Sequence, residues 1–332
     1  MTNFPRLRGL GSLQGRKAPP LPKVLLRRLL ESSYFPLASE LRSALLFRQL
    51  RLDARLTRTV ASALRSPVLT STEQVFGDRA SDTVFILGSG SSVNRLPSQF
   101  FDHIHQHESI GINFWPIHPF PPKTLATETD NVPGPPSKAT EFLSWKIGQP
   151  PLLGTVSSIL TLRPPFPPNK NRLYRLPSET ATRSLLYGRA NMITRSEDNL
   201  VLDLERTIKS LWGKKRVTAL PDNGSSVVRM TFLALAHGFT RIVWVGVDQD
   251  GRGYFWAQGG GSDGYAEASR LFPRKNGEPH STSSSDNRPF SNDIFLRALS
   301  AAAQKTGKSK IFLASGESTL ADEIPVYETD AA

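Results

Sequence analysis

The chain of 332 residues contains no cysteine. This absence excludes disulfides and every site built on thiolates, whether a metal centre or a nucleophile. No apolar run reaches the ~18 residues that a membrane-spanning helix needs, and the N-terminus lacks the uninterrupted apolar core of a secretory signal. We therefore expect a cytoplasmic protein.

Positive charge is concentrated at the start of the chain. Residues 1–65 hold 13 Lys and Arg against three acidic residues, and so carry +10 of the formal net charge of +12. The rest of the chain is nearly neutral. This distribution argues against nucleic acid as a partner of the whole protein.

Residues 1–75 form a predicted N-terminal extension that is basic, partly disordered and partly helical. Leucines recur at helical spacing over residues 25–64 with arginines on the other faces, and Pro36 divides the segment into two helices. Two interpretations remain open. The helices pack on the body of the protein or on a partner chain, or they lie as a basic amphipathic anchor on an anionic membrane surface, peripheral to the inner membrane.

Residues 76–330 alternate short apolar runs with helical patterns. Such alternation predicts an α/β, Rossmann-like fold, with a mostly parallel sheet and helices on both faces. The expected strands are 83–88, 109–113, 124–127, 158–162, 216–220, 241–246 and 310–314, and the clearest helices are 199–211, 226–237 and 292–306. Residues 249–292 are polar with little apolar pattern, and we expect them to form a lid.

Candidate binding residues follow the predicted strands, because ligands of parallel sheets bind at the carboxyl ends of strands. The first strand runs into a glycine–serine loop whose glycines permit a sharp turn and close approach of a ligand. Two serines open the apolar helix 226–237, so its first amides either bind an anion or are simply capped. The residues at these ends are Gly88, Ser89, Gly90, Ser92, Asn113, Glu128, Asp130, Ser225, Ser226 and Asp248.

His103, His105 and His107 alternate as metal ligands on a strand would. No carboxylates complete a convincing set around them, and we expect a polar loop and no metal site.

In order and spacing, these motifs resemble the bacterial sialyltransferases of glycosyltransferase family 42. They are also similar to the related 6-hydroxymethylpterin diphosphokinase-like domain. The resemblance covers about residues 82–320. It implies nucleotide binding by Gly88, Ser89, Gly90, Ser92, Asn113, Glu128, Ser225, Ser226, Asp248 and Tyr254. It also implies that His280, the lid histidine, is the catalytic base. Ser89, Glu128 and Asp250 depart from the family pattern, which has two asparagines and a tyrosine there.

The resemblance implies a sugar-nucleotide glycosyltransferase that inverts the anomeric centre, without a cofactor or metal. Its donor would be a CMP-sugar and its acceptor a glycan or lipid-linked glycan of the lipopolysaccharide type. Two alternatives remain. One is a pterin-type enzyme that transfers pyrophosphate with Mg²⁺ held by Asp248 with Asp250 or by Glu128 with Asp130. The other is a degenerate module that binds nucleotide without catalysis.

Overall fold

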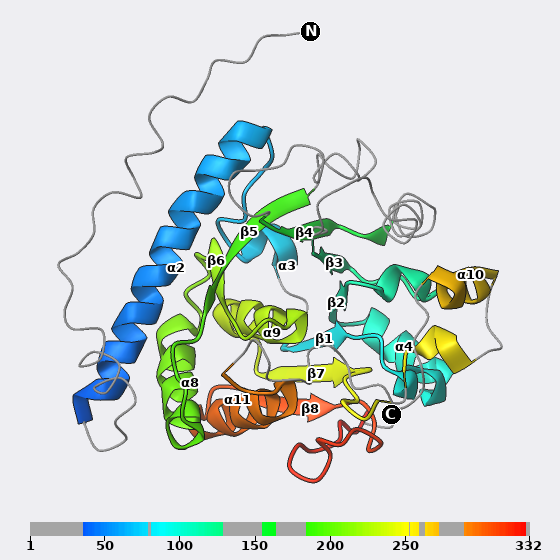
Figure 1. Cartoon of the computed structure of the whole chain (residues 1–332). Coiled ribbons are helices and arrows are strands. Elements are labelled where there is room, and N and C mark those ends of the chain that lie inside the picture. The colour runs from blue at the N-terminus through cyan, green and yellow to red at the C-terminus, as the bar shows by residue number, and fades with distance from the viewer. Residues whose placement is uncertain are drawn as a thin grey trace, which may run out of the picture.

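Parallel strands form one sheet that organises the molecule (Figure 1). The structure is a computed structural model that describes residues 36–78, 81–128, 155–163, 184–251, 253–258, 263–271 and 289–329. In this part of the chain the sheet has eight strands in the order β6-β5-β4-β3-β2-β1-β7-β8, and every neighbouring pair is parallel. The strands are β1 Thr83–Leu87, β2 Glu108–Ile112, β3 Thr124–Thr127, β4 Ser158–Leu162, β5 Ser184–Asn191, β6 Ala219–Asp222, β7 Arg241–Val245 and β8 Lys310–Leu313.

The apolar run of β1 is explained by burial on both faces of the sheet. Val84 and Ile86 join the core on one face, whereas Phe85 and Leu87 join the core on the other. Successive side chains of a strand point to opposite faces, so a strand covered on both sides needs apolar residues throughout.

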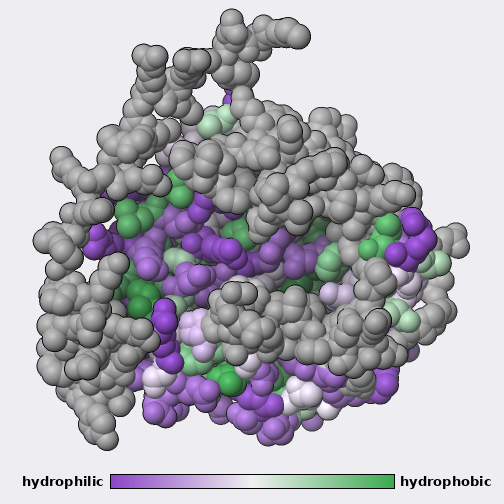
Figure 2. Space-filling view, viewed as in Figure 1, coloured by the Kyte–Doolittle hydropathy of each residue, from purple (hydrophilic) through white to green (hydrophobic). Residues whose placement is uncertain are grey.

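Helices cover both faces, as the sequence predicts. One core receives side chains from α8 (Glu197–Leu211), α9 (Ser226–His237) and α11 (Asn292–Thr306). The opposite core receives them from α4 (Ser98–His105), α10 (Asp263–Leu271) and the 3₁₀ turns η3 (Trp115–Ile117) and η5 (Phe255–Gln258). The remaining short elements are α3 (Glu73–Phe76) and η2 (Ser91–Arg95). Figure 2 shows hydrophilic side chains in a band across the middle of one face of the described surface.

Some helices and strands begin and end where the sequence predicts, and others do not. β3, β4, α9 and α11 have the expected limits, but β6 begins three residues later than predicted and β5 was not predicted. The predicted polar loop around the histidines is wrong, because His103 and His105 lie on α4 and His107 directly precedes β2. Within 249–292 the described residues form η5 and α10.

The described part of the N-terminal extension consists of the helix α2, Pro36–Leu64, and the segment 65–75, which leads into α3. The helix starts at the proline expected to divide residues 25–64, and residues 25–35 lie outside the described residues. Figure 1 shows α2 along the flank of the molecule beside β5, β6 and α8. Leu46 and Leu50 are buried in the core that these elements share. Buried Arg42 donates to the Asp203 carboxylate of α8, with 2.5 Å between Nε and Oδ2. The apolar face of α2 is therefore already packed on the body.

This packing makes a testable prediction about stability. Leu46 is 2% exposed, and we expect Leu46→Ala to lower the free energy of unfolding by about 2–5 kcal/mol, through lost burial and the cavity left behind. Leu52, which is 53% exposed on the same helix, is the control, and Leu52→Ala should change stability by less than about 0.5 kcal/mol. Urea unfolding measures both. Equal stability of the two variants would contradict the packing of α2.

No described helix combines the length and apolar character needed to cross a membrane.

Candidate functional site

A cavity of about 450 Å³ opens at the carboxyl ends of β1, β2, β3 and β7. β1 is flanked by β2 on one side and β7 on the other, so the cavity lies where the strand order reverses. Such a switch point is the usual ligand site of an open α/β sheet. We call it the strand-end cavity. Nine of the ten predicted nucleotide-binding residues line it, namely Gly88, Ser89, Gly90, Asn113, Glu128, Ser225, Ser226, Asp248 and Tyr254.

The glycines of the first loop allow the backbone after β1 to lie against the backbone at the end of β7. The amide of Gly88 donates to the Val245 carbonyl at 2.7 Å, and the amide of Gly90 donates to the Gly246 carbonyl at 2.8 Å. A Cβ on Gly88 would lie 2.7 Å from the Gly246 oxygen, closer than real side chains allow. These glycines thus let β1 and β7 end side by side, which shapes one wall of the strand-end cavity.

Ser92 and Asp248 form a structural contact between the same two loops. The Ser92 amide donates to Asp248 Oδ2 at 2.9 Å, and its hydroxyl donates to Oδ1 at 2.5 Å. Both residues are buried, and Ser92 is the predicted residue that does not line the cavity. Asp248 joins the loops here, which is not the role expected of a metal ligand paired with Asp250.

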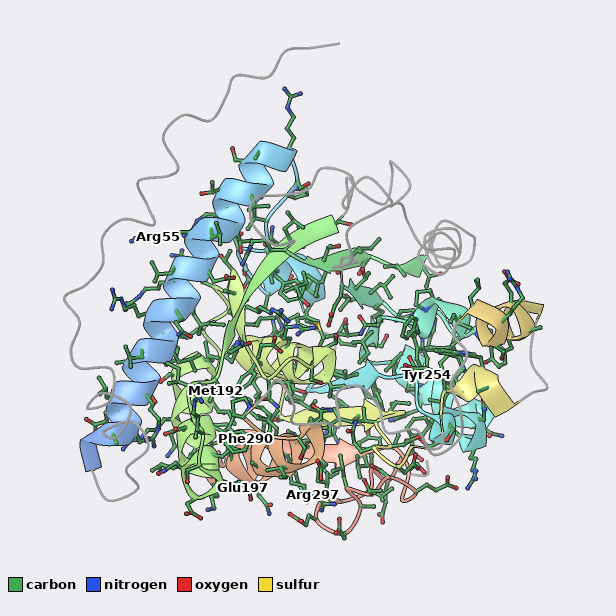
Figure 3. All side chains as sticks on the ribbon, in the orientation of Figure 1. Arg55, Met192, Glu197, Tyr254, Phe290 and Arg297 are labelled. Atoms are coloured by element: carbon green, nitrogen blue, oxygen red, sulfur yellow. The ribbon has the colours of Figure 1, made fainter. Side chains whose placement is uncertain are left out.

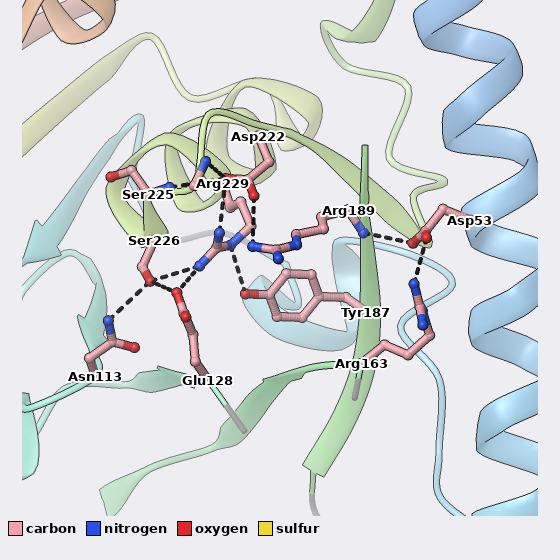
Figure 4. A network of polar contacts seen from close by, with 11 residues as sticks. Asp53, Asn113, Glu128, Arg163, Tyr187, Arg189, Asp222, Ser225, Ser226 and Arg229 are labelled. Atoms are coloured by element: carbon pink, nitrogen blue, oxygen red, sulfur yellow. Dashed lines mark hydrogen bonds and ion pairs between the residues drawn. The ribbon is translucent and has the colours of Figure 1, made fainter. Parts of the chain in front are cut away.

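Asn113, Ser226 and Glu128 all line the cavity, and they lie together in one polar network (Figure 4). The Ser226 hydroxyl donates to Glu128 Oε1 at 2.6 Å and accepts from Asn113 Nδ2 at 3.1 Å. Because that hydroxyl has one proton and gives it to Glu128, the Asn113 amide must be the donor toward Ser226. This fixes the orientation of the Asn113 amide, whose oxygen is buried and has no hydrogen-bond partner among the described residues. Asn113 has a φ of 48°, a left-handed conformation that asparagine tolerates better than most residues.

Arg229, which the sequence analysis did not identify, holds this group together from inside α9. It is 0% exposed, and its guanidinium donates to Glu128 and, at 2.8 Å each, to Ser226 Oγ and Asp222 Oδ1. Burial acts to raise the pKa of Glu128, but the Arg229 charge and the hydrogen bonds from Ser226 and Arg229 outweigh it, so the pKa is lowered. Glu128 is therefore an ionised acceptor at the cavity.

The same network continues toward the N-terminal helix. Asp222 also accepts from Arg189 Nη1 at 3.1 Å, and the Arg189 amide donates to Asp53 of α2 at 2.7 Å. Asp53 is also paired with Arg163 at 2.6 Å. Charged contacts thus run from the cavity to α2, as Figure 4 shows.

The sequence leaves two interpretations of the start of α9 open, an anion site and a simple serine cap. Asp222 Oδ1 accepts from the amides of Gly224 at 2.8 Å and Ser225 at 3.1 Å. A carboxylate of the protein itself therefore occupies these two amides. Ser225 is the N-cap residue, but its side chain makes no capping hydrogen bond.

Aromatic rings form another wall of the cavity. Tyr254 is stacked on Trp256 with ring centroids 4.3 Å apart, and Phe114 lies edge-on to both. An antiparallel bridge pairs Tyr254 with Gly90 and holds this segment against the first loop. In Figure 3 Tyr254 lies near α10, on the side toward which the arrowheads of β7 and β8 point in Figure 1.

Two more amide side chains of the cavity were missed from the sequence. Gln249 and Asn292 line it, and the oxygen of each is buried without a hydrogen-bond partner among the described residues. Asn292 is 2% exposed. With Asn113, three amide oxygens of residues that line the cavity have no donor among the described residues, which is unusual for buried polar atoms.

Other predicted residues lie elsewhere. His280 and Asp130 fall outside the described residues. The rings of His103 and His107 lie 4.5 Å apart on the α4 side, and burial together with the neighbouring His103 lowers the pKa of His107 to about 4. In the described ranges no group of three or more His, Asp or Glu side chains is arranged to hold a metal ion.

Comparison with known proteins gives similarity at the level of the fold. No protein-family model matches the chain, and no curated protein matches it. The monofunctional alpha-2,3-sialyltransferase Cst-I from Campylobacter jejuni aligns with a TM-score of 0.40 and 16% identity, covering 74% of this chain and 80% of that one. A variant of the sialyltransferase CST-II in complex with CMP aligns with a TM-score of 0.38 and 17% identity, covering 74% of this chain and 86% of that one. The pterin-type resemblance finds no support here, and similarity at this level carries no conclusion about activity.

Proposed function

We propose that the protein is a sialyltransferase-like glycosyltransferase that transfers a sugar from a CMP-type donor to a glycan acceptor with inversion. The observation that carries the proposal is the group of Asn113, Ser226 and Glu128 at the strand-end cavity. These three residues, expected from the sequence to bind a nucleotide, come from three separate segments and are joined by hydrogen bonds.

The nucleoside is proposed to bind at this group. A carboxylate accepts hydrogen bonds only, and the amide oxygens of Asn113 and Asn292 are also acceptors. The 4-amino group of cytosine and the two ribose hydroxyls are donors of matching chemistry. Glu128, where the family pattern has asparagine, keeps the acceptor and removes the amide donor, which favours an amino-bearing base over uracil.

The leaving phosphate is proposed to lie toward the first loop and Tyr254. Tyr254 reaches the cavity from the segment that pairs with Gly90, and Ser89 lines the cavity beside it. A phenol or serine hydroxyl donates to a phosphate oxygen and stabilises the charge that develops there.

His280 remains the proposed base that takes the proton of the acceptor hydroxyl. The alternative carboxylates suit this task less well. The lowered pKa of Glu128 makes it a weak base, and both oxygens of Asp248 are engaged by Ser92.

The acceptor and cellular site are proposals too. We keep a glycan or lipid-linked glycan of lipopolysaccharide biosynthesis, and a cytoplasmic protein peripheral at the inner membrane. Because the apolar face of α2 is packed on the body, residues 36–64 would bind an anionic surface through the positive charge of their arginines and not by inserting apolar side chains. In Figure 3, Arg55 extends from the outer side of α2, away from the sheet.

Removal of the Asn113 side chain tests the nucleotide site. Glycine is the appropriate replacement, because alanine at a φ of 48° would add backbone strain. We expect Asn113→Gly to weaken CMP binding by about 1–3 kcal/mol, measured by calorimetry. Asn191→Gly is the control, since Asn191 also ends a strand of the sheet but is exposed and does not line the cavity. Equal CMP affinity in the two variants would remove Asn113 from the site.

A further inference from the structure

A second and larger cavity, of about 950 Å³, lies between α2, α3 and the segment that joins α8 to β6. Its floor includes Phe47, Leu50, Leu211 and Val217, together with Ala219, the first residue of β6. It therefore lies at the amino end of a parallel strand, whereas the strand-end cavity lies at the carboxyl ends. A nucleotide in the strand-end cavity does not account for this second cavity.

The walls of this cavity are strongly basic, and we call it the basic groove. Five cationic side chains line it, namely Arg51, Arg58, Lys214, Lys215 and Arg216. Among the described residues that line it, Glu73 alone is acidic, and it pairs with Lys215 at 2.9 Å. Within the described part of the chain, the other four cations have no ion-pair partner. Uncompensated like charges repel one another, and an anion in the groove would relieve that repulsion.

The cations are held on rigid backbone. Arg51 and Arg58 are seven residues apart on α2 and thus share a face. On the opposite wall, the Lys215 amide donates to the Ala236 carbonyl at 3.1 Å, and the Lys215 carbonyl accepts from the Thr72 amide at 2.7 Å. Lys215 has a φ of 53°, a costly conformation for a lysine. Such strain often accompanies binding sites whose side chains are pre-positioned.

We propose that the basic groove is a second binding site, for a ligand that carries phosphate groups. Guanidinium groups match phosphate oxygens in a bidentate fashion, and lysines add point charges. The apolar floor suits an organic portion attached to the phosphate. This inference does not depend on the activity proposed for the strand-end cavity.

Inorganic pyrophosphate is the probe, titrated calorimetrically into the full-length protein at low salt. We expect binding that weakens as salt is added. The double variant R51A/R216A, which removes one guanidinium from each wall, should bind about tenfold or more weakly, as expected when charge-assisted hydrogen bonds are lost. K305A/K308A is the charge-matched control, because Lys305 and Lys308 are exposed and lie outside the groove.

Tyr254→Phe separates the two cavities, because the Tyr254 hydroxyl is proposed to contact the leaving phosphate in the strand-end cavity and Tyr254 does not line the basic groove. If pyrophosphate binds in the basic groove, its affinity should not depend on this hydroxyl. The proposal is overturned if wild type does not bind pyrophosphate, if R51A/R216A binds like K305A/K308A, or if Tyr254→Phe alone abolishes binding.

Vesicles distinguish the two sources of phosphate. If the ligand is a lipid headgroup, the protein should co-sediment with phosphatidylglycerol vesicles but not with phosphatidylcholine vesicles, and both pyrophosphate and the R51A/R216A substitutions should abolish sedimentation. If the ligand is soluble, pyrophosphate binds and neither vesicle sediments the protein. Sedimentation that survives in R51A/R216A, with no pyrophosphate binding by wild type, contradicts the proposal.

Discussion

Arg229→Met is expected to lower the free energy of unfolding by about 3–5 kcal/mol. Arg229 is 0% exposed and its guanidinium contacts two carboxylates, Asp222 and Glu128. Methionine fills much of the same space but leaves both carboxylates without their principal cation. Burial would lower the pKa of Arg229, but Tyr187, Asp222 and Glu128 raise it, so wild type keeps the charge at every working pH. Urea unfolding monitored by circular dichroism measures the loss.

Arg189→Met is the matched control. Arg189 pairs with the same Asp222 at 3.1 Å, but its side chain is 40% exposed. Removing an exposed cation should cost about 1 kcal/mol or less. If Arg229→Met unfolds at the same urea concentration as Arg189→Met, the buried network does not stabilise the fold.

His280→Ala is expected to lower the rate of sugar transfer by about 10²–10⁴-fold, the usual contribution of a general base. Donor affinity should be nearly unchanged, because the base acts on the acceptor hydroxyl. The wild-type rate should fall at low pH, because a protonated imidazole cannot act as a base, and this acid-side fall should be absent in the variant. Steady-state kinetics over a range of pH measure both effects.

His105→Ala is the control for His280→Ala, because His105 is an exposed histidine on α4. It should leave the transfer rate and the pH profile unaltered. A near-normal rate in His280→Ala would refute the assignment, and Asp250, which lines the strand-end cavity, would be the next carboxylate to test.

Much of the sheet could be predicted because the sequences of buried parallel strands are continuous apolar runs. β1 and β7 are such runs, and the polar residues after them end at the strand-end cavity as expected. β5 was missed because Gly188 and Arg189 interrupt its apolar pattern. The packing of α2 explains the glycine, because a Cβ on Gly188 would lie 1.9 Å from Asp53 Oδ2 of that helix. Arg189 contacts Asp53 and Asp222. β6 was placed too early because Pro221 resembles a strand end, yet β6 is an edge strand, where proline is tolerated.

The candidate site was predicted as a set of residues but not as a network. The family resemblance predicted that Asn113, Glu128 and Ser226 belong to one nucleotide site, and hydrogen bonds join them in the structure. It did not show that Asp222 would occupy the amides before α9, or that Asp248 would be engaged by Ser92. One sequence signal was available for Arg229: it is the only charged residue, histidine aside, in the otherwise apolar helix 226–237. A lone charge in a buried helix needs partners, which points to carboxylates nearby.

Calorimetric titration with CMP, UMP and GMP, each with and without Mg²⁺, tests most directly the claim that the strand-end cavity binds a cytosine nucleotide. The account predicts that CMP binds most tightly and independently of Mg²⁺. CMP at a hundredfold excess over its Kd should stabilise the fold by about 2.7 kcal/mol. At the same CMP concentration, the Asn113→Gly variant should be stabilised by about 1–2.4 kcal/mol less than wild type, as its weaker binding requires. No binding of CMP, or binding of equal strength for all three nucleotides only when Mg²⁺ is present, would contradict the account.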